Sequence, residues 1–268
     1  MIKKYKPTSP GRRHRIVVID PCVSSDKSFP KVRSLRKGIS NTGGRNNSGQ
    51  ITIRHRGGGH KKIVRTIDRA YKKGKFSANC TVLQIEYSPK MGGNIALCAV
   101  GSHSPFYRMA TQNVPVGSSF SGPFVQDDIP KDGDVKFLKD IPQGRHIHSV
   151  EMIPGAGAVL ARSAGAFATL LSHLPNGSSI VLLPSKKTIT LKQNCLATLG
   201  KVGNEKHYLA KAGKAGANRW KGRRPVVRGE AMNAVDHPHG GNSHGSGGKG
   251  KPIKNIWGKL AKFTGSSS

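Results

Sequence analysis

The chain has 268 residues, of which 45 are Lys or Arg and 13 are Asp or Glu, so its formal net charge is +32. Its hydrophobic fraction of 35% is below the ~45–50% of an ordinary globular domain. No run of residues approaches a membrane-spanning helix, the first residues lack the apolar part of a secretory signal, and the four cysteines are scattered. We therefore exclude membrane, secreted and disulfide-rich proteins and expect a polyanionic partner.

The charge is concentrated at the two ends of the chain. Residues 1–75 contain 21 Lys and Arg against 3 Asp and Glu, and residues 201–268 contain 14 against 3. Residues 76–200 contain 10 against 7, a net charge of only +3. Both ends are rich in glycine and poor in long apolar runs. This pattern predicts a nearly neutral globular body with two cationic arms that become ordered only against counter-charge.

Short β-strands dominate the prediction for the body. Apolar and polar residues alternate in segments 83–87, 135–137 and 188–192 and, inside the basic N-terminal third, in segment 50–54. Alternation with period two places one face on a core, and many short strands indicate small β-barrels or sandwiches. Helices are expected only near residues 164–171 and 195–199.

The first basic block surrounds three consecutive glycines, residues 57–59. Glycine leaves backbone N–H groups open to a phosphate, and Arg can hold a phosphate through two parallel hydrogen bonds. A nucleotide-binding loop is one alternative, but residues 57–62 lack its spacing; a solvated flexible loop is another. We favour binding of a nucleic-acid backbone by Arg45, Arg54, His55, Arg56, His60, Lys61, Lys62 and Arg65.

The second basic block, residues 211–229, alternates small residues with cations and contains one aromatic residue, Trp220. This composition predicts an extended strand along an RNA groove, with Trp220 stacked on a base or ribose. Packing of Trp220 in a core is an equally weighted alternative. The cations expected to bind RNA here are Lys214, Arg219, Lys221, Arg223, Arg224 and Arg228.

The segment 236–244 contains four residues of the types found in metal and catalytic sites: Asp236, His237, His239 and His244. A zinc site is disfavoured because no thiolate lies nearby. An enzyme acting on nucleic acid could use Asp236 and His237 as an acid–base pair, with Ser163 or Ser243 as nucleophile, but sequence neighbours rarely form such sites. A phosphate-binding loop at residues 245–251 lacks the following Ser or Thr. We favour histidines that hydrogen-bond to RNA.

Two further patterns resemble sites. The first comprises four aspartates, Asp127, Asp128, Asp132 and Asp134. They lack the continuation of a calcium loop and predict an acidic hairpin edge that faces another protein. The second comprises His146 and His148, whose alternation predicts a strand rather than a metal site.

Four long motifs resemble the family of universal large-subunit ribosomal protein two. They occupy residues 6–13, 43–62, 150–165 (in two parts) and 227–241. The resemblance implies an OB-fold barrel followed by an SH3-like barrel, all-β, with basic extensions buried in ribosomal RNA. The corresponding domains are residues 1–40 (N-terminal extension), 41–120 (OB-fold), 121–200 (SH3-like) and 201–268 (C-terminal extension).

The resemblance also implies a structural role rather than an enzymatic one. The family supports subunit association and the peptidyl-transferase region, which Asp236, His237 and His239 would approach. Arg12, Arg13, His14 and Arg162 join the expected RNA-binding residues. The implied partners are large-subunit RNA, small-subunit RNA at the subunit interface and neighbouring ribosomal proteins, with no membrane and no small-molecule substrate. No cofactor is expected, apart from magnesium that accompanies the RNA.

The chain departs from the family pattern in two places. Residues 88–130 follow it poorly, and the match fades after Gly241. Divergent loops on a bacterial-type frame resemble a mitochondrial ribosomal protein, and a bacterial or plastid ribosome is the alternative. A third class of function, a free-standing single-strand-binding OB protein, is disfavoured because only 6% of residues are aromatic.

Overall fold

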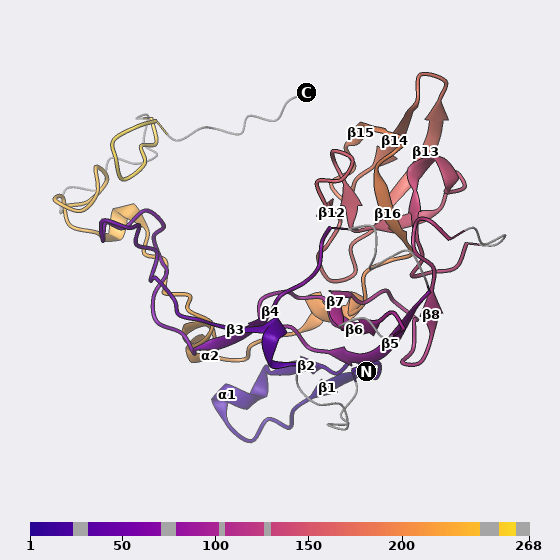
Figure 1. Cartoon of the computed structure of the whole chain (residues 1–268). Coiled ribbons are helices and arrows are strands. Elements are labelled where there is room, and N and C mark those ends of the chain that lie inside the picture. Colours follow the sequence, from indigo (N-terminus) through magenta and orange to yellow (C-terminus); the bar gives the residue numbers. More distant parts are fainter. Residues whose placement is uncertain (24–31, 71–78, 102–104, 126–129, 242–251, 261–268) are drawn as a thin grey trace. The chain divides into compact units, whose positions relative to one another are not determined.

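A computed structural model of the chain describes residues 1–23, 32–70, 79–101, 105–125, 130–241 and 252–260 (Figure 1). The chain divides into unit 1, residues 1–40 and 60–217, and unit 2, residues 41–59 and 218–268. Most regular structure among the described residues is short strands, so the all-β prediction is confirmed. The helices there are α1 (Pro10–Arg13) and α2 (Ala215–Trp220), with single 3-10 turns at Arg33–Leu35, Leu138–Asp140, Glu205–Leu209 and Gly229–Ala231.

The first sheet has four antiparallel strands in the order β7-β6-β5-β8. Its strands are β5 (Cys80–Glu86), β6 (Ile95–Ala99), β7 (Phe106–Met109) and β8 (Ser119–Phe120). A bulge between Val82 and Gln84 shifts the register of β5. The predicted alternation over 83–87 is therefore wrong in detail: Val82 and Ile85 are buried, whereas Tyr87 is exposed.

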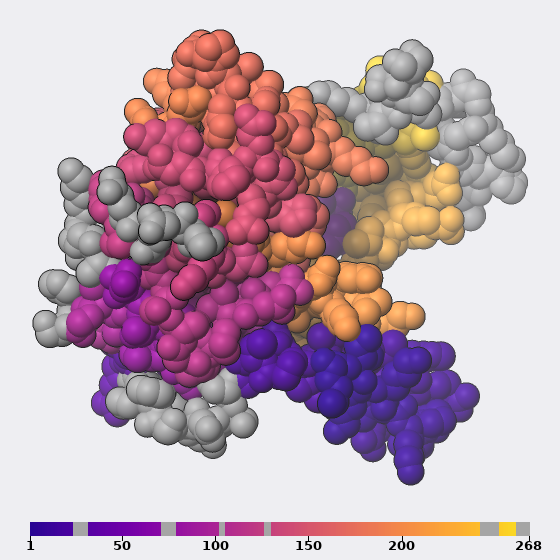
Figure 2. All heavy atoms as spheres, turned by 90° about the vertical axis from the view of Figure 1, so that its right-hand side faces the viewer, coloured from indigo at the N-terminus to yellow at the C-terminus, as the bar shows by residue number. Residues whose placement is uncertain are grey.

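The second sheet has six strands in the order β15-β14-β13-β10-β16-β9. They are β9 (Val135–Phe137), β10 (His146–His148), β13 (Ala168–Leu174), β14 (Ser178–Leu182), β15 (Thr188–Lys192) and β16 (Leu196–Leu199). The pair β11 (Val150–Glu151) and β12 (Ala158–Leu160) adds a short hairpin. In the space-filling view this part of the chain, coloured rose to orange, is one continuous mass (Figure 2).

Two further strand pairs lie outside these two sheets. β1 (Ile2–Lys4) pairs with β2 (Ile16–Val18), and Ile16 also exchanges backbone hydrogen bonds with Lys211. β3 (Arg36–Ile39) pairs with β4 (Lys62–Arg65). This second pair leads directly into segment 41–59 and receives the chain when it returns.

The apolar core lies entirely in the near-neutral part of the sequence. Among the described residues, every buried hydrophobic side chain lies between Cys80 and Val202, and most of them form three clusters. No described residue before Cys80 is buried. Because burial of an unpaired charge is costly, the highly charged parts of the sequence stay in solvent and the nearly neutral part forms the core.

Three local predictions are wrong. Residues 164–171 and 195–199 lie in or beside strands β13 and β16, because pairing with neighbouring strands overrides weak helix propensity. Segment 50–54 forms turns instead of a strand, and its two isoleucines, Ile51 and Ile53, are exposed. It lacks a neighbouring strand whose side chains would cover one face.

Polar contacts join the two sheets inside unit 1. The Arg108 guanidinium, on β7, donates to the carbonyl of Gly133 and to the Thr198 hydroxyl on β16. It lies 4.0 Å from the Phe120 ring centroid. His148, on β10, hydrogen-bonds Thr111 at 2.9 Å. Burial, together with the Arg108 charge, lowers the pKa of His148 to about 3, so the ring is neutral.

No helix among the described residues has the length and apolarity to cross a membrane.

Candidate nucleic-acid interface

Unit 2 is built by two basic segments that are far apart in the sequence. Residues 41–59 and 218–225 pair through their backbones: Gly57 N donates to Gly222 O at 3.2 Å, and Arg224 N donates to His55 O at 3.0 Å. The His55 ring nitrogen Nδ1 lies 3.1 Å from Pro225 O, which fixes the proton on Nδ1 because a carbonyl only accepts. The structure thus brings the two predicted RNA-binding blocks together.

Glycine is required where these two segments meet. Gly59 has φ +86°, and a Cβ atom added to it would lie 2.9 Å from the backbone of Gly222. Such a distance is shorter than real Cβ contacts allow. At this position the glycine allows two backbones to pack against each other. The sequence pattern predicted only that the glycines let a phosphate approach the backbone.

The cations of the paired segments are directed to solvent. Eight Lys or Arg residues of segments 41–59 and 218–228 are exposed: Arg45, Arg54, Arg56, Arg219, Lys221, Arg223, Arg224 and Arg228. Neither segment contains an Asp or Glu. His60 and Lys61 are also exposed, whereas Lys62 is half-buried in β4. The surface of the paired segments is therefore cationic without internal neutralisation, as a polyphosphate ligand requires.

The middle of the second block differs from the predicted extended strand. Residues 215–220 form helix α2, because Ala and Arg favour helix and nothing here pairs as a strand. Trp220, at its end, is 60% exposed, so the alternative of core packing is wrong. An exposed indole between Arg219 and Lys221 remains suited to stacking on a base.

The N-terminal basic residues lie together with Lys214 in unit 1. Arg12 and Arg13 belong to α1, which Pro10 begins, and both are exposed, as is His14. The Arg12 guanidinium lies 5.3 Å from the centroid of the Tyr5 ring. An added Cβ at Gly11 would lie 3.2 Å from the Lys214 side chain. The contact places the Lys214 side chain against Gly11, the residue next to Arg12 in helix α1.

Arg65 is the predicted phosphate ligand that is already paired with a carboxylate. Its Nη2 lies 2.8 Å from Glu86 Oε2, and Arg36 Nη2 lies 3.2 Å from the same oxygen. The Tyr107 hydroxyl donates to Glu86 Oε1 at 2.7 Å. Burial opposes ionisation of Glu86, yet these hydrogen bonds and the two guanidinium charges lower its pKa overall. The group fastens the β3–β4 pair to β5; an RNA contact by Arg65 stays a prediction.

Arg162 faces a second arginine. It is half-buried, and burial together with the nearby charge of Arg69 lowers its pKa. Both line a cavity of about 20 Å³ with Arg108, whose Nη1 is buried and has no hydrogen-bond partner among the described residues. Arg69 is thus a further cation at this place, and the basic run around it in the sequence was the signal that could have indicated it.

The Asp236–His239 segment is organised by backbone contacts. His237 Nδ1 accepts from the backbone N–H of His239 at 3.0 Å, and His239 Nε2 accepts from that of Lys254 at 3.0 Å. Both contacts select neutral tautomers. Because His237 Nδ1 is an acceptor, it cannot donate to Asp236, which is exposed. His239 is buried, and the His237 ring lies over Gly229, leaving no room for a Cβ there.

Several other predicted positions have a structural explanation or are not described. Asp134 is buried and accepts from Ser121 N and Lys131 N, so it braces a turn and is not part of an exposed acidic edge. Asp127, Asp128, Ser243, His244 and segment 245–251 lie outside the described residues. His146 and His148 lie in strand β10, as predicted. No group of three or more potential metal ligands occurs in the described ranges.

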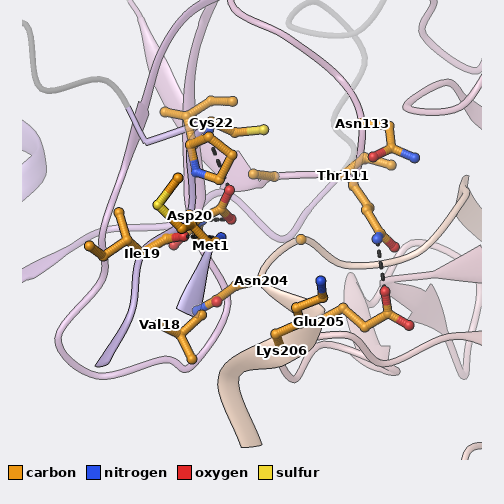
Figure 3. A pocket seen from close by; sticks show the side chains of 16 residues that line it. Met1, Val18, Ile19, Asp20, Cys22, Thr111, Asn113, Asn204, Glu205 and Lys206 are labelled. Atoms are coloured by element: carbon orange, nitrogen blue, oxygen red, sulfur yellow. Dashed lines mark hydrogen bonds between the residues drawn. The ribbon is translucent and has the colours of Figure 1, made fainter. Parts of the chain in front are cut away.

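A separate cavity of about 270 Å³ in unit 1 has no cationic lining apart from Lys206 and the Met1 amine (Figure 3). Asp20 accepts from Asn94 at 2.6 Å, and Gln112 donates to Glu205 at 3.0 Å. Burial and the adjacent Asp20 carboxylate raise the pKa of Cys22 there. A protonated thiol beside carboxylates fits neither phosphate binding nor nucleophilic catalysis.

Buried Glu151 explains a motif that the resemblance noted without a role. Its carboxylate accepts from the backbone N–H groups of Gly155, Gly157 and Leu196, at 3.1–3.2 Å. The side chain is 0% exposed, so these three donors stabilise the only charge in the hairpin β11–β12. Glu151 thus links the β11–β12 hairpin to strand β16 of the second sheet.

Comparison with known proteins agrees with this geometry. The model of the RNA-binding N-terminal domain of ribosomal proteins L2 matches residues 32–121, and that of their C-terminal domain matches residues 131–258. The chain is 44% identical over 250 residues to the large ribosomal subunit protein uL2 of Buchnera aphidicola subsp. Schizaphis graminum (strain Sg), covering 92% of this chain and 88% of that protein.

These matches correct one expectation and confirm another. The C-terminal match continues to residue 258, so the prediction that the resemblance ends at Gly241 is wrong for residues 242–258. The implied fold, an OB-fold barrel followed by an SH3-like barrel, agrees with the two sheets. Both domain models and a bacterial relative identify one protein type: the chain belongs to the ribosomal protein L2 family and is of the bacterial type.

Proposed function

We propose that this structural, RNA-binding constituent of the large ribosomal subunit holds ribosomal RNA chiefly through the paired segments 41–59 and 218–228. The observation that carries the proposal is the set of eight exposed cations on a backbone-paired support that contains no carboxylate. Eight like charges in one small unit repel one another, and RNA phosphates remove this repulsion. The chain is not an enzyme, since its family is structural.

The remaining predicted contacts extend the same proposal. Arg12, Arg13, His14 and Lys214 form a second cationic surface in unit 1, and Arg162 with Arg69 a third. Arginine suits these places because its planar guanidinium can hold a phosphate through two hydrogen bonds. Magnesium would accompany the RNA and needs no site on the protein.

The proposal includes support of the peptidyl-transferase region and of subunit association. The neutral rings of His237 and His239 are held by backbone contacts, so they order the segment 229–241 next to RNA without exchanging a proton. A His237→Ala variant then yields large subunits with slower peptide-bond formation, while the isolated chain shows no turnover. Turnover by the isolated chain that disappears in His237→Ala would instead support the nucleic-acid-processing enzyme. Small-subunit RNA and neighbouring ribosomal proteins complete the partners.

The ribosome that carries the chain is also part of the proposal. A mitochondrial ribosome is the first candidate, and the similarity to a bacterial protein is equally compatible with a bacterial or plastid one. Sedimentation of organelle and whole-cell lysates, followed by detection of the chain in the ribosomal fractions, decides among the three.

Salt dependence tests the main proposal. The full chain binds a transcript of large-subunit RNA, and log K falls linearly with log salt because each neutralised phosphate releases counterions. The double variant Arg223→Gln, Arg224→Gln reduces the slope by about 0.7–0.9 per residue. The matched control Lys186→Gln, Lys187→Gln removes two exposed cations from the turn between β14 and β15 and leaves the slope unchanged. Equal slopes for both double variants contradict the proposal.

A further inference from the structure

A tightly built turn presents Trp257 to solvent. The Asn255 side-chain oxygen Oδ1 accepts from the backbone N–H groups of Trp257 and Lys259, both at 3.0 Å. Asn255 N donates to Lys259 O at 2.7 Å, and Gly258 N donates to Asn255 O at 3.0 Å, with φ +75° at Gly258. Backbone and Asn255 therefore define this turn, and the indole contributes no hydrogen bond to it.

The indole is exposed although the turn around it is ordered. Trp257 is 70% exposed, whereas tryptophan is on average a highly buried residue. The chain has only two tryptophans, and both lie outside the apolar core with cations close by in the sequence. Lys254 and Lys259 flank Trp257 and are exposed. The turn thus offers a flat aromatic face with positive charge on both sides.

The turn is fastened to the segment that we propose to lie next to RNA. Lys254 donates its backbone N–H to His239 Nε2, within unit 2. Anchoring at this residue limits the conformational freedom of the turn before any ligand binds, which lowers the entropic cost of binding.

The charge around Trp257 selects the class of partner. Residues 237–268 contain five Lys and no Asp or Glu. An apolar pocket of another protein would need no such excess, whereas an RNA backbone would be neutralised by it. From the exposed indole, the preformed turn and the flanking cations, we infer that Trp257 is a stacking platform for an unpaired nucleobase of ribosomal RNA. This inference rests on the proposed function.

Fluorescence of a single-tryptophan chain tests the inference. In the full chain carrying Trp220→Phe, Trp257 is the only indole, and a transcript of large-subunit RNA is the probe. Stacking on a base quenches its emission. Stacking is worth ~1–3 kcal/mol per base, so Trp257→Ala in the same background weakens binding by about 5- to 150-fold. Trp257→Phe keeps a ring and recovers most of the affinity. Val116→Ala, at a 45% exposed position outside the segments proposed to bind RNA, leaves it unchanged.

The outcomes separate the two hypotheses. Bound RNA, seen by anisotropy of a labelled transcript, with unquenched emission overturns the stacking inference and leaves the proposed function intact. Absence of any salt-dependent RNA binding overturns the proposed function itself. Emission changes that occur with RNA-free large-subunit proteins, and not with RNA, show that a protein pocket covers Trp257 and overturn the inference. Failure of Trp257→Phe to recover the affinity lost in Trp257→Ala also contradicts it.

Discussion

The ion cluster at Glu86 provides a sharp test of how the basic hairpin is fastened to the body. Glu86 accepts from Arg36, Arg65 and the Tyr107 hydroxyl. Its side chain is 11% exposed, and each arginine side chain is 17% exposed. Glu86→Gln keeps the shape but leaves two nearly buried guanidinium groups without a counter-charge.

The expected cost follows from this geometry. Breaking a buried ion pair costs ~3–5 kcal/mol, and the residual exposure of the arginines reduces this to about 2–3 kcal/mol for Glu86→Gln. Because the pKa of Glu86 is lowered in the folded protein, its contribution is complete above the unfolded value and is lost as pH falls through the folded value. The free energy of unfolding therefore decreases less steeply at acid pH in the variant than in the unchanged chain.

Urea unfolding of the full chain between pH 3 and pH 7 measures both effects. Asp140→Asn, which removes one exposed carboxylate, is the matched control and changes stability by less than about 0.5 kcal/mol. A double-mutant cycle with Arg65→Gln gives a coupling energy of about 1–2 kcal/mol. A loss in Glu86→Gln no larger than in Asp140→Asn, with no coupling to Arg65, would refute the account of the cluster.

Three other perturbations have defined outcomes. Glu151→Gln lowers the free energy of unfolding in urea by about 2–4 kcal/mol, because three backbone N–H groups, those of Gly157 and Leu196 buried, lose a charged acceptor; an unchanged value contradicts this. Burial and the charge of Arg108 lower the pKa of His148 to about 3. Because the unfolded chain binds a proton at this ring and the folded chain does not, the free energy of unfolding falls by about 1.4 kcal/mol per pH unit below about pH 6.5. An NMR titration that finds the ring of the folded protein titrating near pH 6.5 would disprove this. Gly59→Ala weakens RNA binding and leaves the melting temperature of the core unchanged. Gly38→Ala leaves RNA binding unchanged, because a Cβ atom at Gly38 meets open space.

The sequence predicted the body well because composition and burial are directly linked. Apolar residues gather where charge is low, so the buried residues between Cys80 and Val202 follow from the charge profile. The alternation over 188–192 predicted β15 because a regular strand with one covered face repeats every two residues. The bulge in β5 broke the same rule, since an extra residue exchanges the two faces.

The candidate site was predicted by residue type but not by arrangement. Arg56 and Arg223 form a backbone bridge within unit 2, although 166 residues of chain separate them. Backbone hydrogen bonds of this kind do not depend on the side chains, so sequence periodicity and motifs cannot predict them. The ion pair of Arg65 is not visible in the sequence for a related reason: its partner Glu86 belongs to a different strand, and sequence alternation does not show which side chains meet across strands.

Hydrogen exchange tests the central claim, that the cationic segments outside the core are stabilised by RNA, most directly. Amide exchange of the full chain is followed by mass spectrometry with and without the large-subunit RNA transcript. Peptides from 41–59 and 218–228 gain strong protection on binding, and peptides from the six-stranded sheet, protected already, change little. Equal protection of the paired segments with and without RNA would contradict the account.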